Sequence, residues 1–283
     1  MMGLVLEGGA MRGMFTAGVL DVMMESQTEV DGVIGVSAGA TFGCNFVSRQ
    51  IGRTIRYNKR FAKDPRYCSY RSLIRTGNLY NAQFCYYQVP LELDPFDHYT
   101  FKKNPTSFYC VATQMDGKPL YHLCKEGIGK DLLYIQGSAS MPVFARPVKV
   151  DDKELLDGGI SDSIPLEYFE SIGYNKNIVV LTQPRDYHKE PYEHMNIMKM
   201  FLKKKPELIS LLENRHIRYN RQVEYVQSQK EAGKAFIIQP EESLNIGPIE
   251  HDPKELERVY QIGRNVMQKH MDELKEFMKR DLL

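Results

Sequence analysis

Apolar residues in the first half of the chain form short unbroken runs that alternate with stretches of helical spacing. Residues 3–7 (G-L-V-L-E) are the first such run, and residues 33–36 are the second. Residues 14–24 and 38–47 instead carry apolar side chains at the spacing of one helix face. Short apolar runs are typical of buried strands, and strands that alternate with helices are typical of α/β proteins. The pattern therefore predicts an α/β fold.

The same alternation continues to residue 181. Further strands are predicted over residues 107–113, 120–124, 145–150, 154–157 and 177–181, with helices over residues 130–138 and 165–170. Residues 53–101 are rich in tyrosine and basic side chains and have weak periodicity. We expect this middle segment to be irregular and helical.

Beyond Arg185 the pattern changes. Residues 194–229 and 254–279 are long charged stretches with helical spacing, and a late strand is predicted between them over residues 235–239. We therefore predict two regions. The first is a domain over residues 1–185, and the second is a mainly helical C-terminal extension, residues 186–283, packed on it.

Composition places the chain among ordinary globular proteins. Of its 283 residues, 42% are hydrophobic and 26% are charged, and the formal net charge is +1. This balance gives no general electrostatic case for binding nucleic acid. No apolar run reaches the roughly 18 residues of a membrane-spanning helix, and the N-terminus lacks the pattern of a signal peptide. We therefore expect a cytoplasmic protein.

The cysteines follow neither a disulfide pattern nor a metal-binding pattern. There are five, an odd number, and no two stand in a C-x-x-C spacing. Free thiols are therefore expected at Cys44, Cys68, Cys85, Cys110 and Cys124. We predict no zinc site and no cofactor.

Residues Gly35-Val36-Ser37-Ala38-Gly39 match the pattern G-x-S-x-G between a predicted strand and a predicted helix. A serine at such a junction sits in a sharp, strained turn, and the small residues around it prevent clashes. The turn presents the hydroxyl at the end of the strand, where the amides at the start of the next helix face a developing oxyanion. Ser37 is therefore a candidate nucleophile, although an inert serine in a tight turn has the same local pattern.

A second glycine-rich turn, residues 7–13 (E-G-G-A-M-R-G), follows the first predicted strand. A dinucleotide loop would require an acidic residue at the end of the second strand, where this chain has Ser37. A purely structural turn stays open, but backbone amides that stabilise an anion or oxyanion fit better. For Arg12 two interpretations stay open: a fixed positive charge beside an acyl or phosphate group, or a surface salt bridge that orders the loop.

A nucleophilic serine needs a base, and Asp157-Gly158-Gly159 follows a short predicted strand. An aspartate of ordinary pKa, about 3.9, is a weak base, and partial burial would raise that pKa. An ordinary Asp-Gly turn has the same pattern. None of the seven histidines stands in a local pattern that singles it out: His98, His122, His188, His194, His216, His251 and His270.

Together the three motifs resemble the patatin-like phospholipase family. Its pattern is a glycine-rich oxyanion loop ending in Arg/Lys-Gly, then G-x-S-x-G, then Asp-Gly-Gly or Asp-Gly-Ala. This chain has them in that order at residues 8–13, 35–39 and 157–159, and the resemblance covers residues 3–181. The combination is far more specific than any one motif. It implies a three-layer α/β/α fold with a central, mostly parallel sheet.

By this resemblance Ser37 attacks an ester carbonyl and Asp157 takes its proton. Amides of Gly8, Gly9 and Ala10 hold the oxyanion, an acyl-enzyme forms, and water releases it without a metal. The supporting motif residues are Arg12, Gly13, Gly35, Gly39, Gly158 and Gly159. The implied activity is hydrolysis of lipid acyl esters, as in a phospholipase A or lysophospholipase.

Two positions depart from the family pattern. After Asp157 the family often has an asparagine before the helix-starting proline region, where this chain has residues 161–165 (S-D-S-I-P), and Ser163 can still cap the helix. A third glycine also usually stands where this chain has Ala10. Alanine keeps the amide and is small, but it disfavours positive φ. We expect it to be tolerated. Two alternatives stay open: a non-lipid carboxylesterase or acyltransferase with the same dyad, and a catalytically silent lipid- or protein-binding module, which only Ala10 supports.

A lipid hydrolase must also meet its substrate at an interface. Apolar residues precede three lysines in the C-terminal region: Met195, Ile197, Met198, Met200, Phe201, Leu202, then Lys203, Lys204 and Lys205. Such a segment suits peripheral contact with anionic lipid, and equally a helix packed into its own core. The sequence does not indicate the oligomeric state.

Overall fold

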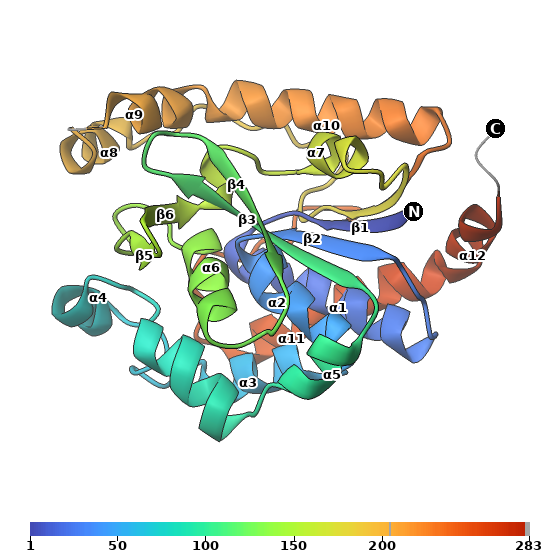
Figure 1. Ribbon diagram of the computed structural model, residues 1–283, viewed down its shortest axis with the longest axis horizontal. Coiled ribbons are helices and arrows are strands. Elements are labelled where there is room, and N and C mark those ends of the chain that lie inside the picture. Colours follow the sequence, from blue (N-terminus) through green and yellow to red (C-terminus); the bar gives the residue numbers. More distant parts are fainter. Residues whose placement is uncertain (204, 281–283) are drawn as a thin grey trace.

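A single sheet organises the computed structural model, which describes residues 1–203 and 205–280 (Figure 1). Eight strands in this part of the chain are hydrogen-bonded in the order β5-β6-β3-β2-β1-β7-β8, with β4 also beside β3. Their bounds are β1 Met2–Leu6, β2 Gly32–Val36, β3 Ser107–Gln114, β4 Pro119–Cys124, β5 Val148–Val150, β6 Lys153–Asp157, β7 Lys176–Val180 and β8 Ala235–Ile238.

The sheet is mostly parallel at its centre. Strands β3, β2, β1, β7 and β8 all run the same way, whereas β4 and β6 are antiparallel to β3 and β5 is antiparallel to β6. Parallel neighbours require crossover helices, and these helices cover both faces of the sheet. The predicted three-layer α/β/α architecture is confirmed.

Alternate strand residues point into two separate cores. In β1, Leu4 and Leu6 pack on one face and Val5 packs on the other. The first face is covered by α1 (Gly13–Glu25), α2 (Ala38–Val47), α3 (Arg53–Phe61), α6 (Lys130–Ser138), α11 (Pro253–Lys269) and α12 (Met271–Lys279). The second face is covered by α7 (Leu166–Ser171) and α10 (Arg215–Glu231), which lie along the top of Figure 1.

Most predicted elements occur, with differences at their ends. The strand predicted over residues 145–150 begins only at Val148. The helical stretch over residues 194–229 is divided into α8 (Met195–Phe201), α9 (Pro206–Glu213) and α10, because a proline such as Pro206 starts a helix but cannot continue one. The stretch over residues 254–279 is divided at His270.

The middle segment is irregular and helical, as predicted. It contains α3, then α4 (Tyr70–Thr76), a π-helix (Phe84–Leu93) and α5 (His98–Lys103). Pro90 lies inside the π-helix. A proline removes one backbone donor from the ladder, and π-type turns occur where the regular ladder is interrupted.

Residues beyond Arg185 supply a strand and parts of both helix layers. β8 pairs in parallel with β7, α10 covers one face of the sheet, and α11 packs along α1. The division of the chain near residue 185 stays a prediction, and residues 281–283 of the predicted extension lie outside the described residues.

The edge of β3 brings two distant strand ends together. β2 lies along this edge until Val36, which is paired with Val111. β4 pairs with the opposite edge of β3. β6 therefore pairs with the same edge of β3 as β2, beyond the end of β2, and Asp157 is paired with Ala112. Since β2 and β6 run in opposite directions, their C-terminal ends meet at neighbouring positions of β3.

Two glycines let α1 and α11 cross in backbone contact. A Cβ atom on Gly18 would lie 2.1 Å from the carbonyl oxygen of Tyr260, and one on Gly263 would lie 2.0 Å from that of Phe15. We expect Gly263→Ala to lower the free energy of unfolding by about 2 kcal/mol, because the helices must separate to admit the methyl group. Urea denaturation measures the effect. Gly247→Ala is the control, since its nearest neighbour would be 3.4 Å away, and an equal loss in both variants would contradict the expectation.

Candidate active site

Ser37 lies in a strained turn between β2 and α2. Its φ is 54° and its ψ is −118°, a conformation that residues other than glycine rarely adopt. Gly35 and Gly39 are required by space, since a Cβ atom on either would lie 2.4 Å from a backbone oxygen. The predicted sharp turn is confirmed.

Ser37 and Asp157 are hydrogen-bonded to each other, although 120 positions separate them in the chain. Ser37 Oγ donates to Asp157 Oδ2 at 2.7 Å, and the amide of Gly159 donates to Oδ1 at 2.8 Å. The backbone of Asp157 is also fixed, because its amide donates to Ser140 and its carbonyl accepts from Thr113 Oγ1. The carboxylate therefore faces the hydroxyl in one orientation.

The environment of Asp157 makes it a stronger base than a free aspartate. Burial raises the pKa of this carboxyl, while the hydrogen bond from Ser37, the charge of Arg215 and the amide of Gly159 offset part of the rise. A raised pKa brings a carboxylate closer to the proton affinity that general base catalysis needs.

No histidine completes a triad in the described part of the chain. His194 and His216 line the same cavity as Ser37, and His216 Nδ1 is buried without a hydrogen-bond partner. Neither one is hydrogen-bonded to Ser37 or Asp157; Asp157 instead accepts from Ser37 and Gly159. The geometry is that of a Ser-Asp pair.

The glycine-rich loop lies against Ser37. A Cβ atom on Gly8 would be 3.0 Å from Ser37 Cβ, and residues Ala10–Arg12 form a single 3₁₀ turn before α1. Among the described residues, the amides of Gly8, Gly9 and Ala10 donate no hydrogen bond to the protein. They are free to bind an oxygen atom of a ligand.

The other motif glycines permit close backbone approaches. A Cβ atom on Gly13 would lie 2.8 Å from the Phe42 ring, and one on Gly158 would lie 2.2 Å from the carbonyl oxygen of Val111. One on Gly159 would lie 3.0 Å from the Arg215 guanidinium.

Arg12 makes no ion pair with any carboxylate of the described residues, which removes the support for a surface salt bridge. Its Nε atom is buried without a hydrogen-bond partner, and the side chain lines the same cavity as Ser37.

That cavity has a volume of about 820 Å³, and its lining side chains fall into an apolar group and a polar group. One part lies among the middle segment and is lined mainly by apolar and aromatic side chains: Tyr57, Tyr67, Tyr80, Tyr86, Val89 and Phe96. The other part is polar and is lined by Arg12, Lys189 and Arg215. Such a cavity suits an amphiphilic ligand.

A family model described as patatin-like phospholipase matches residues 4–170, more than half of the chain. The chain belongs to the patatin-like phospholipase family. A second model, a domain of unknown function (DUF6363), matches residues 205–279. The family membership agrees with the observed sheet and with the order of the three motifs.

Among the relatives of this chain, the uncharacterized protein YjjU of Escherichia coli is 28% identical over 92% of this chain and 74% of its own length. Lysophospholipase nte1 of Aspergillus fumigatus is 27% identical over 60% of this chain, which spans only 11% of that protein. The crystal structure of VipD from Legionella pneumophila superposes with a TM-score of 0.47 at 14% identity, covering 96% of this chain and 67% of that one.

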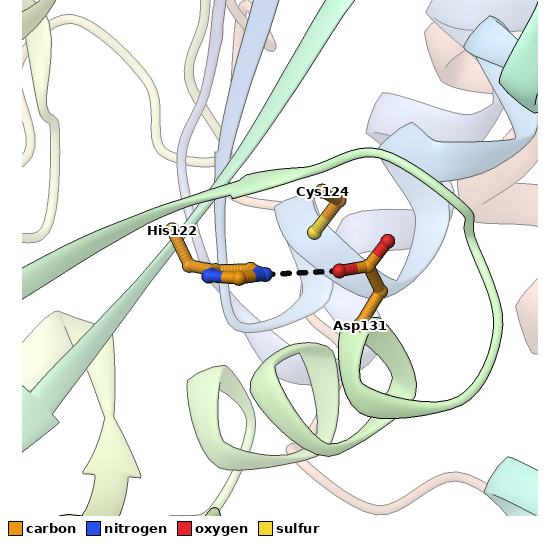
Figure 2. A group of neighbouring side chains, drawn as sticks. All are labelled: His122, Cys124 and Asp131. Atoms are coloured by element: carbon orange, nitrogen blue, oxygen red, sulfur yellow. Dashed lines mark hydrogen bonds and ion pairs between the residues drawn. The ribbon is translucent and has the colours of Figure 1, made fainter. Parts of the chain in front are cut away.

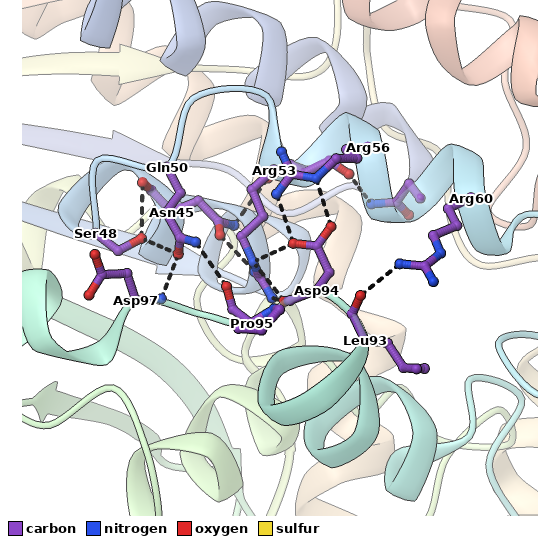
Figure 3. A network of polar contacts seen from close by, with 12 residues as sticks. Asn45, Ser48, Gln50, Arg53, Arg56, Arg60, Leu93, Asp94, Pro95 and Asp97 are labelled. Atoms are coloured by element: carbon purple, nitrogen blue, oxygen red, sulfur yellow. Dashed lines mark hydrogen bonds and ion pairs between the residues drawn. The ribbon is translucent and has the colours of Figure 1, made fainter.

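A network of polar contacts around a buried ion pair includes Arg53, which lines the cavity (Figure 3). Arg53 Nε lies 3.3 Å from Asp94 Oδ1, and both side chains are almost completely buried. Arg53 also donates to the backbone oxygen of Asp94 and to Asn45 Oδ1. Arg56 donates from Nε and Nη2 to the two carboxylate oxygens of Asp94. The network joins α2 and α3 to the end of the π-helix. Removing one partner would leave a buried charge uncompensated.

His122, Cys124 and Asp131 are close enough to suggest a metal site, but their bonding is structural (Figure 2). Asp131 Oδ2 accepts three backbone amides, from Lys125, Glu126 and Gly127, and Oδ1 is 2.9 Å from His122 Nε2. Burial raises the pKa of the Cys124 thiol, which favours its protonated form. The cluster shapes the loop before α6.

Sequence reasoning missed the cavity residues contributed from beyond Arg185. Lys189, Arg215, His216 and Tyr219 line the cavity from the second face of the sheet. No motif marks them, because single charged residues on or before a helix look like an ordinary solvated surface.

Ala10 has φ of 48°, in the region that the sequence predicts alanine to disfavour. We expect Ala10→Gly to keep the fold and the loop, with a change in unfolding free energy of no more than about 1 kcal/mol, because relief of strain and added chain entropy oppose each other. Ala10→Val, with a β-branched side chain at positive φ, is expected to lose about 2 kcal/mol. Thermal denaturation of both variants measures the difference. Equal stability of Ala10→Val and Ala10→Gly would contradict this expectation.

Proposed function

We propose that this chain is a serine acyl hydrolase that cleaves acyl esters of lipids, with Ser37 as nucleophile and Asp157 as base. The observation that carries the proposal is the 2.7 Å hydrogen bond from Ser37 Oγ to the buried Asp157 carboxylate. Three features support it: free amides beside the hydroxyl, an amphiphilic cavity, and membership of the patatin-like phospholipase family.

In the proposed reaction Ser37 Oγ attacks the ester carbonyl carbon while its proton moves to Asp157 Oδ2. The carbonyl oxygen becomes an oxyanion that the amides of Gly8, Gly9 and Ala10 stabilise. The bond to the alcohol oxygen then breaks, and that oxygen leaves with the proton from Asp157. Water attacks the acyl-serine, gives a proton to Asp157, and the released acid leaves as Ser37 recovers its proton.

The apolar part of the cavity would take the acyl chain. Its aromatic side chains come from α3, the π-helix and the segment between them, and the volume of about 820 Å³ exceeds the need of a short ester. This favours a lipid substrate of phospholipase A or lysophospholipase type over a small non-lipid ester.

We also propose peripheral contact with a membrane. No helix of the described residues is long and apolar enough to span a bilayer. Ile74 on α4 is 86% exposed, and Met200 and Phe201 on α8 are 65% and 59% exposed. Both helices lie on the same side of the molecule (Figure 1). Tyr70, the first residue of α4, and His194, which directly precedes α8, line the cavity. A cytoplasmic location fits this proposal.

Not all of the predicted contact segment is available for this role. Met198 and Leu202 are buried in a small apolar cluster with Leu156 of β6 and with Leu208 and Leu212 of α9. Ile197, Met200 and Phe201 are exposed beside Lys199 and Lys203, and Lys204 lies outside the described residues. Apolar side chains ringed by lysines suit anionic lipid.

Ser37→Ala and Asp157→Asn are both expected to abolish ester hydrolysis, with a loss of about 10³-fold or more. Asparagine can still accept from the Gly159 amide and can donate to Ser37 Oγ, so the turn is preserved while the base is lost. Because burial raises the pKa of Asp157, the ionised form costs folding stability above that pKa, and Asp157→Asn should unfold at higher temperature at pH 7. Lipid-release assays and thermal melts measure both effects.

Asp162 provides a matched control for Asp157. It is a buried carboxylate on the same loop, bonded to Tyr121 and Gln222 rather than to Ser37. Asp162→Asn should therefore keep most of the activity and the labelling by a fluorophosphonate probe. Retained turnover in Asp157→Asn, or a loss of about 10³-fold in His194→Ala or His216→Ala, would overturn the Ser-Asp proposal.

The membrane proposal is tested with Ile74→Ser combined with Phe201→Ser. Binding to vesicles that contain anionic phospholipid should fall by about tenfold or more, because each exposed apolar side chain is worth on the order of 1–2 kcal/mol when buried in lipid. Tyr99→Ser is the control, since Tyr99 is 69% exposed on α5, away from α4 and α8. Equal vesicle binding by all variants in sedimentation would reject this surface.

A further inference from the structure

The polar part of the cavity gathers three cationic side chains from three separate segments. Arg12 comes from the loop after β1, Lys189 from the segment after β7, and Arg215 from the first residue of α10. All three line the same cavity as Ser37. Lys189 and Arg215 lie outside the residues that match the patatin-like phospholipase model.

Lys189 is held in place without a carboxylate partner among the described residues. Asn220 of α10 fixes its backbone, accepting from its amide at 2.9 Å and donating to its carbonyl at 3.0 Å. The ammonium lies 4.7 Å from the ring centre of Tyr219 and 5.6 Å from that of Tyr187. Burial and the nearby charges of Arg215 and Arg12 lower the pKa of Lys189 to about 8. The cations therefore repel one another, and the charge of Glu7 offsets only part of this repulsion.

The two arginines also keep unused hydrogen-bonding capacity. Arg215 Nε donates to the carbonyl oxygen of Gly159 at 2.6 Å, which orients the guanidinium beside the Asp157 loop. Arg12 Nε is buried with no partner. Within the described residues, neither side chain forms a salt bridge with a carboxylate.

The carboxylates around this part of the cavity are engaged elsewhere. Glu7 accepts from Tyr219 and from the amide of Thr182, and Asp157 accepts from Ser37 and Gly159. Glu190 and Glu193 line the cavity but are exposed and form no ion pair with the three cations in the part of the chain that the structure describes.

We propose that Lys189 and Arg215, with Arg12, form a subsite for a phosphate group carried by the ester substrate. Cations that converge from three segments match a tetrahedral phosphate, whose several oxygens accept from different sides, better than a planar carboxylate, which one arginine binds. This subsite rests on the proposed hydrolase function. An ester at Ser37 then directs its acyl chain into the aromatic part of the cavity and its phosphate toward the cations.

The test compares two esters of the same acyl chain, the hexanoyl ester of glycerol 3-phosphate and hexanoylglycerol. Wild-type protein is expected to favour the phosphorylated ester by about tenfold or more in kcat/KM, because charge-assisted hydrogen bonds to the phosphate are lost in the neutral ester. Lys189→Gln should reduce this ratio by about tenfold, and Lys189→Arg should restore most of it. Lys230→Gln, an exposed lysine on α10, is the matched control.

A ratio near one in the wild type, or a ratio that Lys189→Gln leaves unchanged, would overturn the subsite while leaving the hydrolase proposal intact. If neither ester is cleaved and Ser37 is not labelled, the hydrolase proposal fails. In that case calorimetry measures how tightly the phosphorylated ester binds to Ser37→Ala with and without Lys189→Gln. This comparison tests the subsite independently of hydrolysis. Tight binding of inorganic phosphate without preference for the phosphorylated ester would identify a site for the free ion and reject the proposal.

Discussion

The candidate site depends on how two strands share one edge of β3. β2 ends at Val36, opposite Val111, and β6 arrives from the other direction to end at Asp157, opposite Ala112. Strand register fixes side-chain positions to within one residue, because a slip by one position reverses every side chain. The hydroxyl and the carboxylate therefore meet without any direct link between their loops, and the hydrogen bond between them follows from the register.

This arrangement has a cost that the surrounding structure offsets. Ser37 is strained at positive φ, Ala10 is strained in the facing loop, and Asp157 is an ionisable group almost removed from water. Each feature opposes folding when taken alone, since strain costs on the order of 1–3 kcal/mol per residue. Two cores, one on each face of the sheet, hold these residues in place. Features that oppose stability and cluster in one cavity indicate a site kept for chemistry.

Local patterns in the sequence predict the elements that depend only on residue spacing and on the positions of glycines. The strand before Ser37, the helix over residues 130–138 and the turn at Asp157 all follow from spacing and glycine positions. The meeting of Ser37 with Asp157 follows only from the family resemblance, because register between distant strands leaves no local signal. The sequence does not single out Lys189 and Arg215 for the same reason. Their proposed role depends on where α10 packs, and a lone basic residue has no distinctive pattern.

The position of α10 joins stability to recognition. Tyr219 and Val226 of this helix pack on the second face of the sheet, so α10 is part of the core. The same helix holds Lys189 through Asn220, presents Arg215 to Gly159, and reaches Glu7 through the Tyr219 hydroxyl. Burial and the Glu7 carboxylate raise the pKa of Tyr219, so the tyrosine remains a donor and the bond persists. A change in the packing of α10 would therefore alter the polar wall of the cavity as well as the core. The proposed phosphate subsite therefore depends on the packing of α10, whereas the proposed nucleophile and base are positioned by β2 and β6.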